Sequence, residues 1–85
     1  MTLPTIHMNG TSAADLLEDN CKAGCAIQAA IRALEHAGPN GRDYYTQGPQ
    51  ALRAAQDEHQ ARVEKLAGVL AELQAMADYI VERMP

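Results

Sequence analysis

The fold is decided by residues 52–84, LRAAQDEHQARVEKLAGVLAELQAMADYIVERM. Steps of four and three alternate along this stretch and connect positions that are mostly apolar, namely Leu52, Gln56, His59, Val63, Leu66, Leu70, Leu73, Ala77, Ile80 and Met84. This alternation places the positions on one side of a helix and is typical of coiled-coil packing. Pro49 suits the first position of a helix. The sequence therefore predicts a helix over residues 49–84 with one apolar seam.

A shorter helix is predicted over residues 12–37. Ser12 is a good N-cap, with Thr11 as the alternative, and Gly38-Pro39 ends the helical pattern. Its apolar residues form two adjoining stripes, one of Leu16, Ala23, Ile27, Ala30, Leu34 and Ala37 and the other of Leu17, Cys21, Gly24 and Ile31. Because one seam contacts one neighbour, the two stripes predict a second neighbour, which would be another chain.

These helices predict an all-α fold of one domain, an antiparallel two-helix hairpin with a long second helix that assembles as a symmetric oligomeric helical bundle. Residues 1–11 form a lead-in, and residues 38–48 (GPNGRDYYTQG) form the connector. At about 1.5 Å per residue the helices are roughly 38 and 54 Å long. The second helix should therefore extend past the first beyond about Ala75, leaving Met76, Ile80, Val81 and Met84 to be covered by the lead-in or by another chain.

Composition excludes several classes of protein. The 85 residues carry a net charge of −4, which argues against binding to a nucleic-acid polymer. No apolar run approaches the roughly 20 residues of a membrane span. Residues 1–10 lack the pattern of a secretory leader, so we expect a cytoplasmic protein. Cys21 and Cys25 are then expected to be reduced thiols rather than a disulfide. They are not expected to hold a structural zinc ion, because such an ion needs four ligands. No metal and no cofactor are predicted.

The connector concentrates polar and aromatic side chains. Its eleven residues exceed what a turn requires and include two of the three tyrosines of the chain. Tyr44 or Tyr45 would stack on a planar ligand, and Arg42 would hold its anionic group. Asp43 or Gln47 would form hydrogen bonds with the edge of the ligand. In the structural alternative, one tyrosine plugs the end of the hairpin, while Asp43 caps the second helix or pairs with Arg42.

Two polar residues, Gln56 and His59, occupy seam positions next to the connector. A buried polar group without a partner costs about 1–3 kcal/mol, so each needs a partner or borders a site. Either they line the floor of the connector site, or they form hydrogen bonds that fix the register of the helices.

A second polar cluster comprises His7, Asn9, Thr11 and Ser12, before the first helix. The free N–H groups of a helix start favour an anion, although ordinary capping by Thr11 or Ser12 explains the same residues. The helix lengths put the two clusters roughly 38 Å apart in one chain. A shared site would therefore join residues 7–12 of one chain to residues 42–47 of another.

Residues 6–12 (IHMNGTS) and 39–48 (PNGRDYYTQG) resemble small helical-hairpin proteins encoded in bacteriophage and prophage genomes. The resemblance implies a protein of the cytosol of an infected bacterium and carries over no catalytic residue. Small helical phage proteins of other families act as sponges for nucleotide immune signals or as stoichiometric inhibitors of host proteins. That comparison is an analogy of size and setting.

The sequence thus predicts a non-catalytic homo-oligomer that sequesters a small nucleotide-like signalling ligand between subunits, a counter-defence sponge. Arg42 and the start of the first helix would hold phosphate, and Gln56 and His59 would line the floor. The predicted ligand-binding residues are His7, Asn9, Thr11, Ser12, Arg42, Asp43, Tyr44, Tyr45, Gln47, Gln56 and His59. The alternative is a protein–protein interaction module, an inhibitor or adaptor, that uses the face of residues 76–84. A third possibility is a small hydrolase with His59 or His7 as general base.

Overall fold

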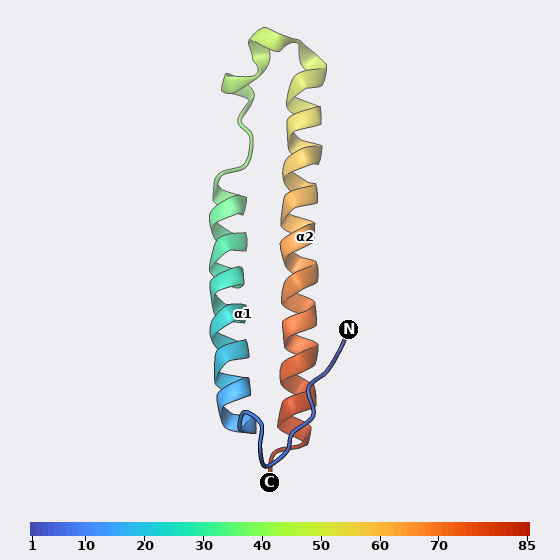
Figure 1. The fold of residues 1–85 in the computed structure, drawn as a ribbon. Coiled ribbons are helices and arrows are strands. Elements are labelled where there is room, and N and C mark those ends of the chain that lie inside the picture. Colours follow the sequence, from blue (N-terminus) through green and yellow to red (C-terminus); the bar gives the residue numbers. More distant parts are fainter.

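The computed structural model describes all 85 residues and contains helices but no strand. Helix α1 (Ala13–His36) lies antiparallel to helix α2 (Pro49–Glu82), as Figure 1 shows. Two short 3-10 helices, η1 (Gly41–Asp43) and η2 (Tyr45–Gln47), connect them. The prediction of an all-α two-helix hairpin is confirmed.

The two long helices begin differently. The Ser12 side-chain oxygen accepts a hydrogen bond from the backbone N–H of Asp15 at 3.1 Å, so Ser12 rather than Thr11 caps α1. Helix α2 has Gly48 at its N-cap, with φ of 102° and no side-chain cap, and Pro49 follows. Glycine adopts that backbone conformation readily because it has no Cβ. No side chain caps the first turn of α2, in which Pro49 has no N–H and the N–H of Ala51 donates to the Gly48 carbonyl oxygen at 3.3 Å.

Helix α1 contacts α2 along the line between its two predicted stripes. The inner members of both stripes are half-buried there, namely Leu16, Leu17, Gly24, Ile27, Ile31 and Leu34. The outer members, Ala23 and Ala30 on one side and Cys21 on the other, stay exposed. The apolar face of α1 is therefore wider than α2 covers.

The seam of α2 differs from the prediction at one position. Ala55 is buried, whereas Gln56 is exposed. Positions 55 and 56 flank the line that faces α1, and the apolar side chain turns inward because burying an unpartnered amide costs free energy. The prediction that Gln56 lies on the seam was wrong.

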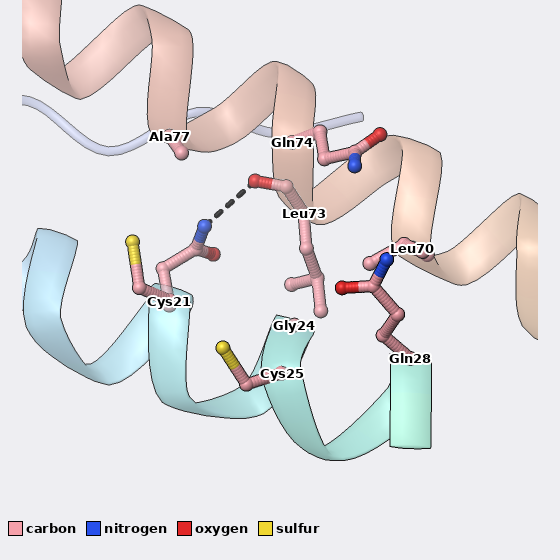
Figure 2. A pocket seen from close by; sticks show the side chains of 9 residues that line it. Cys21, Gly24, Cys25, Gln28, Leu70, Leu73, Gln74 and Ala77 are labelled. Atoms are coloured by element: carbon pink, nitrogen blue, oxygen red, sulfur yellow. Dashed lines mark hydrogen bonds between the residues drawn. The ribbon is translucent and has the colours of Figure 1, made fainter. Parts of the chain in front are cut away.

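Two side chains fix the register of the helices by hydrogen bonds to backbone carbonyls. The Asn20 amide donates from Nδ2 to the carbonyl oxygen of Leu73 at 2.6 Å, the dashed line in Figure 2. Near the connector, Nε2 of His59 donates to the carbonyl oxygen of Leu34, also at 2.6 Å. This register places the start of α1 opposite Ile80, whose side chain is only 1 % exposed.

The predicted overhang at the C-terminal end of α2 is therefore wrong. The additional length of α2 lies at the connector end, where residues 37–48 continue along α2 before crossing to it (Figure 1). The estimate from helix length placed the turn directly after α1. Because the connector first runs on in the direction of α1, the end of α2 that extends past α1 is the one that begins at Pro49, and the connector lies beside it.

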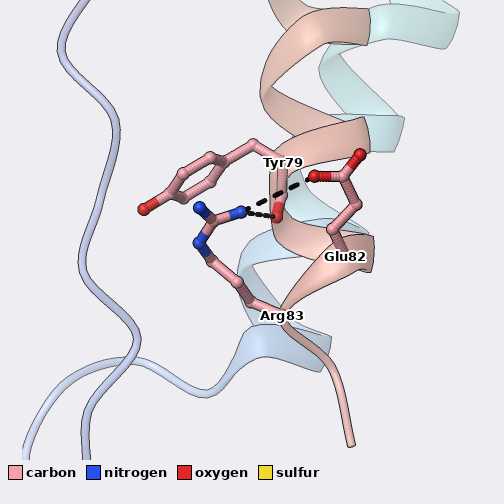
Figure 3. Close-up of polar contacts among 3 residues, drawn as sticks. All are labelled: Tyr79, Glu82 and Arg83. Carbon is pink, nitrogen blue, oxygen red and sulfur yellow. Dashed lines mark hydrogen bonds and ion pairs between the residues drawn. The ribbon is translucent and has the colours of Figure 1, made fainter.

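The lead-in runs beside the C-terminal turns of α2, as Figures 1 and 3 show. Pro4 and Ile6 are half-buried, whereas Met8 is 96 % exposed. A turn follows, in which the N–H of Gly10 donates to the carbonyl oxygen of His7 at 3.1 Å. A Cβ at Gly10 would lie 2.9 Å from Nε2 of the exposed His7 ring, so another residue here would displace that ring.

The molecule is a rod of 62 × 20 × 17 Å with very little interior. Three of its 85 residues are buried, namely Ala13, Ala55 and Ile80. Its exposed surface is 6350 Å², whereas a compact protein of 9.2 kDa exposes about 4,900 Å². The single hairpin thus leaves more surface in water than a compact protein of the same mass.

Candidate functional site

The connector is shaped by one asparagine and a run of short backbone hydrogen bonds. The Asn40 side-chain oxygen accepts from the N–H of Arg42 at 2.9 Å and begins η1. The N–H of Tyr44 then donates to Gly41, and that of Gln47 donates to Tyr44. These turns leave Arg42, Asp43 and Gln47 exposed. The polar side chains of the connector are therefore presented to solvent on an ordered backbone.

The two connector tyrosines border a slot at the start of α2. Tyr44 is half-buried and Tyr45 is 77 % exposed. The slot has a volume of about 400 Å³ and is lined by Gly41, Tyr44, Tyr45, Gly48, Pro49 and Leu52. This volume falls within the range of about 300–1,000 Å³ that is typical of small-molecule sites. Two aromatic rings and the start of α2 therefore lie together at this slot.

A second, polar hollow lies between the connector and α2. Its lining includes Asn40, Asp43, Glu58, His59 and Arg62, around about 280 Å³. Gln56 is not part of it. His59 lines this hollow with its Nε2 already bonded to Leu34, so the register-fixing alternative describes this residue. The two predicted floor residues are therefore not brought together.

The charges of the connector are unpaired. The ion pairs of the chain are Lys22 with Glu18 at 3.0 Å and Arg83 with Glu82 at 3.8 Å, and neither involves Arg42 or Asp43. Asp43 also does not cap α2. The structural alternative considered for these two residues is therefore not observed, and the guanidinium of Arg42 is available to an anion.

The second predicted cluster lies at the other end of the rod (Figure 1). Asn9 and Thr11 are exposed, the ring of His7 lies against Gly10, and the hydroxyl of Ser12 is engaged in capping α1. One chain therefore cannot bring residues 7–12 and 42–47 to the same ligand.

The third tyrosine forms a contact that the sequence analysis missed. The Arg83 guanidinium carbon lies 3.5 Å from the centroid of the Tyr79 ring (Figure 3). Nη1 of Arg83 also donates to the Tyr79 carbonyl oxygen at 3.1 Å, which satisfies one of the last carbonyls of α2. The signal was the i,i+4 spacing of an aromatic and a basic residue near a helix end.

A groove between α1 and α2 was also missed. It has a volume of about 200 Å³ and is lined by Asn20, Cys21, Gly24, Cys25, Gln28, Leu70, Leu73, Gln74 and Ala77. Figure 2 shows both thiols on this side of α1. The signal in the sequence was the pair of cysteines on either side of a helix-interior glycine, Gly24.

The chain matches no protein-family model, no curated protein and no solved structure. Its side chains bring together no group of three or more His, Cys, Asp or Glu that could hold a metal ion. Neither long helix combines the length and the apolar character needed to cross a bilayer.

Proposed function

We propose that the protein is a non-catalytic binding protein that sequesters a small anionic, nucleotide-like ligand at the connector. The observation that carries the proposal is the slot beside Tyr44 and Tyr45, which adjoins the uncapped start of α2. Stacking of a base on an aromatic side chain contributes about 1–3 kcal/mol. The free N–H groups of a helix start bind phosphate, and a guanidinium binds it bidentately.

The phosphate is assigned to α2 rather than to α1 for a local reason. Ser12 caps α1, so its hydroxyl occupies part of the donor set there, whereas no side chain caps α2, where the N–H of Gln50 stays free beside Pro49 and the bonded N–H of Ala51. The start of α2 and Arg42 also belong to the same connector end as the tyrosines. Stacking surface and phosphate donors then come from one chain, and the ligand need not touch residues 7–12 of a second chain.

Binding without turnover is part of the proposal. The imidazole nearest the connector, that of His59, donates its Nε2 to a backbone carbonyl and serves the register of the helices. In the bacteriophage setting implied by the sequence resemblance, tight binding without chemistry would remove a nucleotide signal from the cytosol of the host. The protein would then act as a counter-defence sponge.

The proposal includes a symmetric homo-oligomer as the working form. Its support is the exposed surface of 6350 Å² and the small number of buried residues, three of 85. A hairpin with so little interior gains stability when a second chain covers its apolar faces. The wide apolar face of α1, which α2 covers only in part, also supports an oligomer.

The test is calorimetric titration of the full chain with a panel of cyclic and linear nucleotides. We expect one class of nucleotide to bind, and we expect Arg42→Ala and Tyr45→Ala each to weaken binding at least tenfold. Arg53→Ala is the matched control, because Arg53 is also an exposed arginine but belongs to α2, whereas Arg42 belongs to the connector beside the slot-lining residues Gly41 and Tyr44. Binding by none of the panel, or equal loss in the control, would overturn the proposal. Recovery of a converted nucleotide after heat denaturation would show an enzyme instead.

A second candidate, the protein–protein interaction module, is favoured by the distribution of exposed apolar side chains. Five of the seven large hydrophobic residues that are exposed belong to the lead-in or the C-terminal turns, namely Met1, Leu3, Met8, Val81 and Met84. This candidate predicts that Met84→Asp abolishes partner binding and leaves nucleotide binding unchanged. Ile80 is not available to a partner, because it is buried inside the hairpin.

A further inference from the structure

The groove between α1 and α2 carries features that the hairpin itself does not require. The first is Gly24, in the interior of α1, where glycine costs about 1 kcal/mol relative to alanine. A Cβ at this position would meet only the Cδ1 of Leu70, at 3.7 Å, an ordinary van der Waals distance. Packing of α1 on α2 therefore does not demand glycine, but an additional helix that approaches the groove closely would.

The second feature is the pair of thiols. Cys21 and Cys25 are exposed in the single chain and lie one helical turn apart beside the groove (Figure 2). Cysteine ranks among the residue types most often found fully buried, also when it forms no disulfide. Two exposed cysteines on one wall of an apolar groove indicate a surface that is covered in the working form.

The third feature is the absence of charge. None of the nine residues that line the groove is charged, although charged residues make up 21 % of the chain. The centres of protein interfaces are depleted of charged residues in the same way. For a chain of net charge −4 an uncharged patch is also where a second copy meets the least repulsion.

We propose that this groove receives the same groove of a second copy of the chain, so that two hairpins form a four-helix bundle. The inference rests on the oligomer included in the proposed function and assigns its interface. A two-fold dimer uses the same patch on both copies, which suits a self-complementary surface of small and uncharged side chains. The outer amides of Gln28 and Gln74 line the groove and can pair across the axis.

The surface area supports a second copy as the occupant. The chain exposes about 1,400 Å² more than a compact protein of its mass. A stable interface of standard size buries about 800 Å² on each partner, and permanent dimers bury more. The surplus of one chain is thus sufficient for one such interface.

The experiment measures the mass of the full chain in solution by analytical ultracentrifugation over a range of concentrations. We expect the wild type to be a dimer and Cys25→Glu to raise the dissociation constant at least 100-fold, because its carboxylate would be buried without a partner. Ala26→Glu is the matched control, since Ala26 is an exposed residue of α1 that does not line the groove and lies on another side of the helix from Cys21, Cys25 and Gln28. We expect it to dimerise as the wild type does.

A second measurement covers the case in which Cys25→Glu does not fold. In the Cys21→Ser variant the remaining thiol should react with an alkylating reagent more slowly as the protein concentration rises. A wild type that is monomeric at all concentrations would overturn both the oligomer and the interface. An oligomer that survives Cys25→Glu, with a thiol rate independent of concentration, would overturn the interface alone. Neither result bears on nucleotide binding at the slot.

Discussion

Nε2 of His59 lies 2.6 Å from the carbonyl oxygen of Leu34 and so connects the third turn of α2 to the end of α1. That carbonyl also accepts the backbone N–H of Ala37, which ends the helix. A single imidazole therefore sets the register of the hairpin at the point where α1 ends and the connector begins. Loss of the His59 side chain should therefore affect the free energy of unfolding more than the affinity for a ligand.

We expect His59→Ala to lower the free energy of unfolding by about 0.5–1.5 kcal/mol, because the hydrogen bond to Leu34 is lost while its carbonyl oxygen keeps the N–H of Ala37. The measurement is urea unfolding at one fixed protein concentration, since dimerisation makes stability depend on concentration. His36→Ala is the control, because His36 is exposed and forms no side-chain hydrogen bond. Equal effects of the two substitutions would contradict this role of His59.

Ile80→Ala should be among the most damaging single substitutions in the chain. Ile80 is the most deeply buried side chain, and truncation of a buried isoleucine to alanine costs about 2–5 kcal/mol. Its neighbour Val81 is 52 % exposed, so Val81→Ala should cost little. If α2 extended past α1 at its C-terminal end, the two variants would unfold at similar urea concentrations.

The N-cap of α1 offers a sharp comparison between adjacent hydroxyls. We expect Ser12→Ala to destabilise the protein by about 1 kcal/mol, since its oxygen accepts the N–H of Asp15. Thr11→Ala should change stability by less than about 0.5 kcal/mol, because Thr11 is exposed and does not cap. Thermal unfolding followed by circular dichroism would measure both, and the reverse order would assign the cap to Thr11.

Replacement of two glycines by alanine should change the stability of the protein in opposite directions. Gly68 lies within α2 with no atom near its Cβ position, so Gly68→Ala should raise stability by about 0.5–1 kcal/mol. Gly48→Ala should lower it, because φ is 102° there. The pair is measured by the same thermal unfolding. A loss on Gly68→Ala would reveal that the outer face of α2 is packed against another surface.

The helices themselves could be predicted from local signals. Ser12, Gly38-Pro39 and Pro49 mark ends that agree with the structure to within about two residues, the usual uncertainty of helix boundaries. Capping and turn chemistry act over a few residues, so they are visible in the sequence. The same reasoning identified the tyrosine-rich connector as unusual.

The register of the hairpin could not be predicted in this way. It depends on Asn20 reaching Leu73 and on His59 reaching Leu34, partners that lie 53 and 25 residues apart in the chain. Both acceptors are backbone carbonyls. Every residue has one, so the sequence does not show which carbonyl will accept a hydrogen bond. The path of the connector along α2 was missed for the same reason, and the overhang was therefore expected at the wrong end.

That path separates the two regions to which we assign ligand binding and dimerisation in our proposals. Helix α2 begins beyond the last turn of α1, and the tyrosine slot lies at the first turn of α2. The slot is therefore distant from the groove formed by residues 20–28 and 70–77. Occupancy of the slot and pairing of the grooves then involve no shared side chain. A dimer of this kind would titrate as two equal and independent sites, and dilution to the monomer would leave the affinity of each unchanged.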